Sequence, residues 1–485
     1  MKTITRSFIS NTFFANDLAN KVKFDKLSLS KNIDYWKYIL VTKFNAKHGE
    51  SIIIGHQNLN IDYLATIYAA AELSLKIVII DYIRQDNFND LNFFDPKTKV
   101  LSPIDIFIHD FNNEYLENGS PGFEKFNFFK RYSKRTYSII DDIESSADID
   151  QDEFNRISNI QPCKDDILIK ATSSGTTNTP KVIEHTHEFI HAVSLRNTQL
   201  YKTGNAAVHV KNLNHGASAA VTLFPAIASD DISQHFIYSV DEDGPLTEFV
   251  ELLSPYRNEV AFMSFPYPYL TDKFVESSND IGVTWPNLNL ITLSYIVESA
   301  KNAVRDKKFK SIVSIFGSTE TIGPVFTNHI TTDRWDCDSR YFKKVDDFYK
   351  IDLSSDGKIS ITPPVYNFPH ITNDYFIRED EFFVHQGRSD LVRINGEHFD
   401  LATINKLNKE NDKFYIVVDT VSQCLYLAYW EDILQEEINS YITEIENNFK
   451  RITVNKSKQL IKKSFYYGIK LDNELLREYF RNHIT

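Results

Sequence analysis

Short apolar runs alternate with amphipathic stretches along the first part of the chain. Residues 34–47 have the apolar spacing of a helix, and the apolar run 52–54 after Gly49 predicts a strand. The stretch 63–75 repeats the helical pattern and leads into a second β-rich run at 77–80. Alternation of this kind predicts βαβ units and a mostly parallel sheet.

The middle of the chain has weaker patterning. A further strand is predicted at 104–108, and the acidic stretch 141–153 is predicted to be a solvated linker. Between 206 and 238 apolar runs alternate with turns. Residues 281–319 have the pattern of a strand, a helix and a second strand, which extends the α/β organisation.

The pattern changes after Lys350 to short β-runs, followed by a charged helix at 431–450. These runs lie at 358–362, 382–385, 414–418 and 425–430. The change predicts a small C-terminal α+β domain. The expected fold class is therefore α/β, with a large N-terminal domain of parallel and mixed sheets flanked by helices.

Composition limits the possible classes of function. A chain of 485 residues is long enough for two or three domains, and its 42% hydrophobic and 25% charged content is typical of a globular protein. The net charge of -13 argues against a nucleic-acid partner, because phosphate neutralisation needs a basic surface. Glycine is scarce, with 15 residues.

Nothing in the sequence indicates export or a membrane span. The first residues are interrupted by Arg6, Asn11 and Asp17, and no apolar run approaches the about 18 residues that span a bilayer. The three cysteines are far apart in the sequence, which indicates no disulfide framework and favours a reducing, cytoplasmic compartment. We expect each cysteine to be a small buried side chain. The 14 histidines show no metal-binding spacing.

The segment 172–181 is the strongest candidate for ligand binding. It follows the apolar run 167–169 and combines several Ser and Thr hydroxyls with Gly175 and Lys181. Backbone N–H groups, hydroxyls and an ammonium group together suit a polyphosphate. The spacing differs from that of a Walker A loop, and a plain turn is the alternative interpretation.

Two later segments add complementary chemistry. In 314–320 an aromatic residue at a predicted strand end precedes a glycine, Thr319 and Glu320. An aromatic ring can stack on a base, glycine allows close backbone approach, and a carboxylate suits Mg²⁺. Further along, Asp374 follows Thr372-Asn373, and Arg388 lies in Gly387-Arg388-Ser389-Asp390.

In this order the segments resemble the motifs of the adenylate-forming enzymes, the superfamily of acyl-CoA synthetases, adenylation domains and luciferases. Asn178 and Val182 stand where that family has glycines. The resemblance implies an ATP site in which Glu320 holds Mg²⁺, Thr319 bonds the α-phosphate, Asp374 binds the ribose and Arg388 contacts ribose or phosphate. It further implies that adenine and triphosphate are held by Phe316, Gly317, Thr172, Ser173, Ser174, Gly175, Thr176, Thr177 and Lys181.

The resemblance also assigns catalytic roles and a domain boundary. Lys470, in Gly468-Ile469-Lys470-Leu471, corresponds to the family's catalytic lysine, although an exposed structural lysine is the alternative. Thr176 and Glu320 are the other residues expected to be catalytic. The implied domains are 1–389 and 390–485, and the small domain would rotate about Asp390.

The acyl pocket is expected near His215, Gly216 and Ser294, although His215 could equally be a core histidine. The segment around His215 offers no carboxylate for an α-ammonium group, which favours an aliphatic or aryl acid without one. Ser294 and Tyr295 stand where the family has small residues, so the resemblance implies a narrower pocket here. His185 and His187 are interpreted as structural.

The implied activity is ATP-dependent formation of an acyl-AMP with release of pyrophosphate. Transfer to a thiol would follow, either to CoA or to the phosphopantetheine of an acyl or peptidyl carrier protein. Two alternatives remain open. One is an amino-acid adenylation protein that loads a carrier, and the other is a divergent member that binds nucleotide without turnover.

Overall fold

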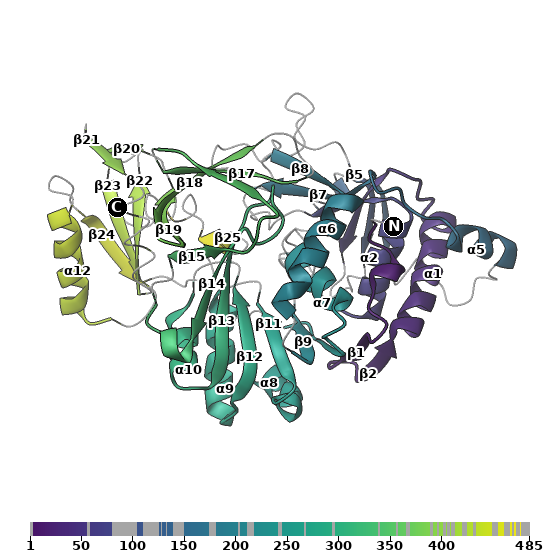
Figure 1. Cartoon of the computed structure of the whole chain (residues 1–485), viewed down its shortest axis with the longest axis horizontal. Coiled ribbons are helices and arrows are strands. Elements are labelled where there is room, and N and C mark those ends of the chain that lie inside the picture. Colours follow the sequence, from purple (N-terminus) through teal and green to yellow (C-terminus); the bar gives the residue numbers. More distant parts are fainter. Residues whose placement is uncertain are drawn as a thin grey trace.

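The computed structural model is a mixed α/β protein built on two large sheets (Figure 1). The α/β class expected from the sequence is confirmed. The structure describes residues 3–55, 59–79, 104–109, 126–127, 129–131, 133–138, 150–173, 181–201, 204–210, 218–240, 245–265, 268–292, 296–337, 340–355, 357–364, 369–388, 391–394, 397–400, 404, 408, 413–419, 424–429, 433–448, 454–459, 466–467, 470–471 and 476.

The first sheet is six-stranded, in the order β6-β5-β3-β4-β7-β8. Its strands pair in parallel except for the antiparallel hairpin of β7 and β8. The strands are β3 (Ser51–Gly55), β4 (Lys76–Ile79), β5 (Ile104–His109), β6 (Ser133–Ser138), β7 (Ile167–Ser173) and β8 (Lys181–Thr186). Helix α2 (Ile61–Glu72) connects the parallel strands β3 and β4, as the βαβ pattern predicts, and helix α1 (Lys26–Thr42) precedes β3.

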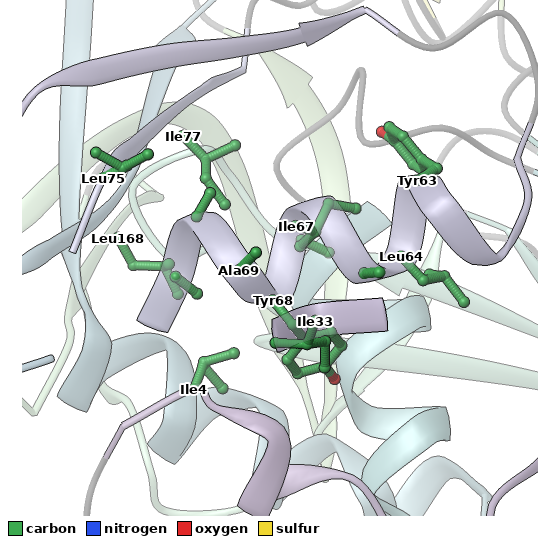
Figure 2. Close-up of a cluster of buried hydrophobic side chains, with 14 of the residues drawn as sticks. Ile4, Ile33, Tyr63, Leu64, Ile67, Tyr68, Ala69, Leu75, Ile77 and Leu168 are labelled. Carbon is green, nitrogen blue, oxygen red and sulfur yellow. The ribbon is translucent and has the colours of Figure 1, made fainter. Parts of the chain in front are cut away.

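Helix α2 is buried on all sides and organises the core beside this sheet. Figure 2 shows its side chains packed among residues of the N-terminal segment, α1 and the neighbouring strands. Ile4, Ile33, Ile77 and Leu168 lie around it. Consecutive alanines at 69–71 let the helix approach its neighbours closely, and each is fully buried. A helix that is apolar all round belongs inside a large core.

The second sheet is 13-stranded, in the order β16-β17-β18-β19-β15-β14-β13-β12-β11-β9-β10-β1-β2. Its strands from β10 to β13 run parallel, and β13 and β14 form an antiparallel hairpin. The strands are β1 (Phe14–Asp17), β2 (Val22–Asp25), β9 (Ala206–His209), β10 (Gln234–Ile237), β11 (Val260–Ser264), β12 (Trp285–Thr292), β13 (Phe309–Phe316), β14 (Phe326–Thr331), β15 (Tyr341–Lys344), β16 (Lys350–Leu353), β17 (Lys358–Thr362), β18 (His370–Glu379) and β19 (Phe382–Arg388).

Helices cover both faces of this second sheet. One face packs against α8 (Thr247–Leu253), α9 (Pro268–Ile281) and α10 (Glu298–Arg305). The other face meets the π-helix η5 (Ser218–Leu223) and α7 (Phe224–Ala228), which together with α6 (His187–Asn197) also contribute to the core of the first sheet. These helices therefore form a layer between the two sheets (Figure 1). Short 3₁₀ turns lie at η1 (Arg6–Phe8), η4 (Thr198–Tyr201), η6 (Ser254–Tyr256) and η7 (Thr332–Arg334).

The C-terminal part of the chain forms smaller sheets of its own. A three-stranded sheet packs on α12 (Gln435–Asn448) through a separate hydrophobic cluster that includes Phe414, Leu427 and Ile445. The strands of this part are β20 (Leu391–Ile394), β21 (Glu397–Asp400), β22 (Phe414–Asp419), β23 (Cys424–Tyr429), β24 (Val454–Gln459), β25 (Tyr466–Tyr467) and β26 (Lys470–Leu471).

Three sequence expectations were wrong in detail. Helix α1 begins at Lys26 because the Asp25 side chain accepts a hydrogen bond from the Ser28 N–H and caps it. The end of the expected acidic linker is the start of helix α5 (Gln151–Ser158), capped by Asp150, since carboxylates stabilise a helix N-terminus. Cys163 is exposed rather than buried. Among the described residues, no helix is both long and apolar enough to cross a bilayer.

A buried ionic cluster joins the N-terminus to α1, α2 and α5. Glu72, with no exposed side-chain surface, accepts hydrogen bonds from the Arg6 guanidinium at 2.6 and 2.9 Å and from the Lys37 ammonium at 3.0 Å. Lys37, equally buried, also donates to the carbonyls of Ser158 and Ile160. Burial opposes ionisation of Glu72, but its bonds to Arg6 and Lys37 outweigh burial and lower its pKa.

We expect Glu72→Gln to lower the free energy of unfolding by about 3 kcal/mol, because it leaves the buried Lys37 ammonium without its counter-charge, whereas Arg6 keeps its ion pair with Asp34. Urea unfolding measures this change. The matched control is Glu153→Gln, which removes a charge from the first turn of α5 and breaks its exposed ion pair with Arg156, and it should lower the free energy of unfolding by less than about 1 kcal/mol. Equal effects of the two substitutions would contradict the assigned role of the cluster.

Four histidines are buried in the neutral form. The pKa values of His185, His187 and His209 are lowered to about 4, mainly because burial removes water from the charged ring. Burial also lowers the pKa of His235 well below its usual value, and the ring of His209 adds to this. The rings of His209 and His235 share a hydrogen bond of 3.0 Å between Nε2 and Nδ1.

These histidines predict a loss of stability in mild acid. The unfolded chain takes up their protons near pH 6.5, whereas the folded chain does so only near pH 4. The free energy of unfolding should therefore fall steadily as the pH is lowered between these values. Urea unfolding at several pH values tests this, and a free energy that stays constant over the window would contradict it.

Candidate active site

The β7–β8 hairpin carries the segment that the sequence marks as a polyphosphate loop. Thr172 pairs with Val182 and Ser173 pairs with Lys181, so the backbones of these residues flank the connection between the two strands. Ser174, Gly175, Thr176 and Thr177 lie outside the described residues. The connection joins two antiparallel strands, unlike the strand-to-helix turn of a Walker A loop.

The turn from β13 to β14 carries Gly317, Thr319 and Glu320. Its ends are closed by the pairing of Phe316 with Phe326. Within it the N–H groups of Thr321 and Ile322 donate to the Ser318 carbonyl. Gly317 is required by space, because a Cβ atom there would lie 2.4 Å from the Gly323 carbonyl oxygen.

Three side chains from outside the turn bond to its backbone carbonyls. His185 of β8 donates from Nε2 to the carbonyl of Thr319 at 2.9 Å. The Tyr349 hydroxyl donates to Thr321 at 2.8 Å, and Arg196 of α6 donates to Pro324 at 2.5 Å. Arg196 also bonds to Asp346 at 2.6 Å, and its guanidinium lies over the rings of Phe348 and Tyr349. The turn therefore has a fixed shape, and His185 ties it to the β7–β8 hairpin.

The side chains at this turn differ in their surroundings. The Phe316 ring packs among Phe326, Phe342, Phe376 and His385, with ring centroids 5.1–6.1 Å away. Glu320 is partly exposed, and its Oε2 lies 3.4 Å from Nε2 of His370 at the start of β18. The turn thus presents an aromatic ring and a carboxylate at the end of β13.

Strands β18 and β19 hold the predicted ribose-binding residues next to each other. Asp374 pairs directly with Arg388 across the two strands. The backbone N–H of Asp374 donates to the Thr372 hydroxyl, and its carboxylate Oδ1 lies 3.0 Å from Nε2 of His385. Because His385 also touches the Phe316 ring, Asp374 and the β13 turn share one neighbour.

Most of the described motif residues come to the same region. The β7–β8 hairpin, the β13–β14 turn and the β18–β19 pair are connected through His185, His370 and His385. Lys470 pairs with Tyr467 in a small sheet of the C-terminal part. The predicted acyl-pocket residues His215, Gly216 and Ser294, and the predicted hinge Asp390, lie outside the described residues.

Sequence reasoning missed the residues that hold this arrangement together: His370, His385, Arg196 and Tyr349. Each acts through a contact with a residue distant in sequence, and none belongs to a motif. The number of histidines in the sequence does not indicate which of them lie at the site. Within the described part of the chain, no three His, Cys, Asp or Glu side chains gather as a metal site.

No protein-family model matches the chain, and no curated protein matches it in sequence. Solved structures match nearly all of it. McyG A-PCP with phenylalanyl-adenylate aligns with a TM-score of 0.70 at 14% identity, over 99% of this chain and 96% of that chain. The anthranilate CoA ligase AuaEII with anthranoyl-AMP gives 0.68 at 13%, over 97% and 94%. O-succinylbenzoate CoA synthetase (MenE) of Bacillus subtilis with ATP and magnesium gives 0.66 at 14%, over 94% and 95%.

The chain has the fold of the adenylate-forming enzymes. The likeness expected from the motifs is thus confirmed for the architecture as a whole. This chain shares the fold with these enzymes although only 13–14% of the aligned residues are identical. The role of each side chain is therefore argued from this chain's own geometry.

We expect Arg196→Met to loosen the β13–β14 turn, because it removes the donor to Pro324 and the partner of Asp346. The free energy of unfolding should fall by about 2 kcal/mol. Hydrogen exchange should accelerate at the amides of Ile322 and Val325, which bond within the turn. Arg156→Met on α5 is the exposed control and should change neither measurement. Unchanged exchange in the Arg196 variant would show that the turn does not depend on this arginine.

Proposed function

We propose that this chain activates a carboxylic acid with ATP, giving an acyl-adenylate and pyrophosphate. The observation that supports this most is the meeting of three motif segments in one region of an adenylate-forming fold. Thr319 and Glu320 lie on a turn tied by His185 to the β7–β8 hairpin, and Asp374 of β18 pairs through its backbone with Arg388 of β19. A nucleotide with its triphosphate toward the hairpin and its ribose toward Asp374 would contact all three segments.

The chemistry follows from this placement. A carboxylate oxygen of the acid attacks the α-phosphorus, the bond from that phosphorus to the bridging oxygen breaks, and pyrophosphate leaves. Negative charge accumulates around the α-phosphoryl group, so fixed cations and hydroxyl donors stabilise the transition state. We assign these tasks to Lys470, Lys181, Thr176 and Thr319, with Arg388 and Asp374 holding the ribose side.

Glu320 is suited to hold a magnesium ion that is also bound by substrate phosphates, rather than an ion enclosed by protein ligands alone. Mg²⁺ is usually held by one or two carboxylates, substrate phosphates and water. Glu320 is a single, partly exposed carboxylate, which fits this mode of binding. No group of three or more potential metal ligands occurs among the described residues. When bound, the ion would neutralise charge on the phosphates.

The second step and the substrate are finer proposals. We propose an aliphatic or aryl acid without an α-amino group, and transfer of its acyl group to the thiol of CoA or of a carrier-protein phosphopantetheine. The thiolate would attack the acyl carbon and AMP would leave. Residues 390–485 would act as a small domain that turns about Asp390 between the two steps. The separate hydrophobic cluster of the C-terminal part supports this division.

Amino-acid adenylation is the second candidate, favoured by the similarity to McyG A-PCP with phenylalanyl-adenylate. ATP–pyrophosphate exchange separates the two. We expect exchange with 3-phenylpropionate-type acids and little with the matching amino acids such as phenylalanine. The reverse preference would establish amino-acid activation. Binding of ATP with no exchange for any acid would identify a nucleotide-binding protein without turnover and overturn the proposal.

Lys470→Ala tests the catalytic assignment. We expect the exchange rate to fall at least about a hundredfold, because one preorganised charge at the transition state is lost. ATP affinity, measured by calorimetry, should stay nearly unchanged. Lys458→Ala in β24 is the matched control and should keep the full exchange rate. Normal exchange in the Lys470 variant would show that another cation performs this role.

A further inference from the structure

A histidine contacts each of three motif residues of the candidate site. His185 reaches the backbone of Thr319, His370 lies 3.4 Å from Glu320, and His385 lies 3.0 Å from Asp374. Of the two contacts to carboxylates, the one between His385 and Asp374 is the shorter and the more deeply buried. Side-chain exposure is 8% for His385 and 16% for Asp374.

A β-bulge brings His385 onto the same face as Asp374. Asp374 pairs with Arg388 and Tyr375 with Gly387, so regular pairing would continue with Phe376 opposite Gln386. The register shifts at this point, and Phe376 pairs with His385 instead. Asp374 lies two residues from Phe376 on the same face, so His385 is its diagonal neighbour. Without the bulge a glutamine would occupy that place.

Packing fixes the plane of the His385 ring. Its centroid lies 4.9 Å from the Phe376 ring and 5.6 Å from the Phe316 ring. An ionised carboxylate only accepts hydrogen bonds, so Nε2 of His385 carries the hydrogen and donates to Oδ1 of Asp374. Thr372 meanwhile bonds to the Asp374 backbone. Backbone and carboxylate of Asp374 are therefore each held by a separate partner.

We propose that His385 is a positioning residue for ribose recognition: its bond to Oδ1 holds the Asp374 carboxylate in the orientation that accepts the ribose hydroxyls of the nucleotide. This inference rests on the proposed function. A carboxylate accepts about four hydrogen bonds, so the histidine and two hydroxyl donors are compatible. A carboxylate already held in place loses less side-chain freedom when the nucleotide binds, which increases affinity.

The test is binding of ATP, 2′-deoxyATP and 3′-deoxyATP with Mg²⁺, measured by calorimetry without an acid substrate. The wild-type protein should bind ATP more tightly than either deoxynucleotide. His385→Leu should weaken ATP binding about tenfold, as expected for part of a charge-assisted hydrogen bond, and should weaken each deoxynucleotide less, because only one ribose hydroxyl remains to bond to Asp374. The preference for the intact ribose should therefore shrink.

Two further variants separate positioning from general damage. His385→Gln keeps an N–H donor of similar reach and should restore most of the ribose preference. In an Asp374→Asn background, His385→Leu should have no further effect on ribose preference, because the positioned group is already gone. If the leucine variant does not fold, His385→Asn replaces it, since the shorter amide cannot reach Oδ1 and should lose the preference too. His48→Leu, which removes the exposed contact with Asp166, is the control.

Each outcome has a distinct meaning. Equal weakening of all three nucleotides by His385→Leu would assign the histidine a structural role only and overturn this inference. A wild-type protein that binds ATP and both deoxynucleotides equally would also overturn it, while leaving acid activation open to the exchange test. No binding of any nucleotide would count against the proposed function itself.

Discussion

The backbone of the β13–β14 turn is held by hydrogen bonds from three side chains that do not belong to that hairpin. His185 of β8, Arg196 of α6 and Tyr349 each donate to a carbonyl of the turn. The two large sheets and the helical layer between them therefore meet at this turn. If its shape changed, Phe316, Glu320 and the neighbouring strand β18 would lose their present relation, and the candidate site depends on that relation.

Glycine is scarce in this chain, and at the β13–β14 turn it occurs where two backbone segments lie too close together for a side chain. Gly317 and Gly323 face each other so closely that a side chain at Gly317 would meet the carbonyl of Gly323. In and directly after the segment 172–181, by contrast, Asn178 and Val182 stand where the adenylate-forming enzymes have glycines. Histidine contacts occur at the same site, where each links two strands or a strand and a turn. Side-chain hydrogen bonds thus supply part of the order in this site.

Local patterns in the sequence predicted much of the fold. The strand–helix–strand pattern of 281–319 corresponds to β12, α10 and β13, and the β-run 358–362 coincides with β17. These elements were predictable because apolar periodicity and burial agree in them. The order of the motifs also predicted the fold family. The roles of Lys470, Asp374 and Arg388 remain predictions from that resemblance.

Other features depend on contacts between distant residues and leave no local signal. The bulge that brings His385 to Asp374 is a shift in pairing between two strands, and the sequence of either strand alone does not encode it. Arg6, Lys37 and Glu72 form a buried cluster, but in the sequence each looks like an ordinary exposed charged residue. The first residues of helix α5, 151–153, were assigned to a linker because acidic residues favour both solvent and a helix N-terminus.

A crystal structure of the protein with ATP and Mg²⁺ tests the central claim most directly, because it places the nucleotide relative to named residues. The account predicts the base against Phe316, the ribose hydroxyls in hydrogen-bond contact with the Asp374 carboxylate, and the triphosphate between Glu320 and the β7–β8 hairpin. A nucleotide bound elsewhere, or bound here with its ribose turned away from Asp374, would contradict it.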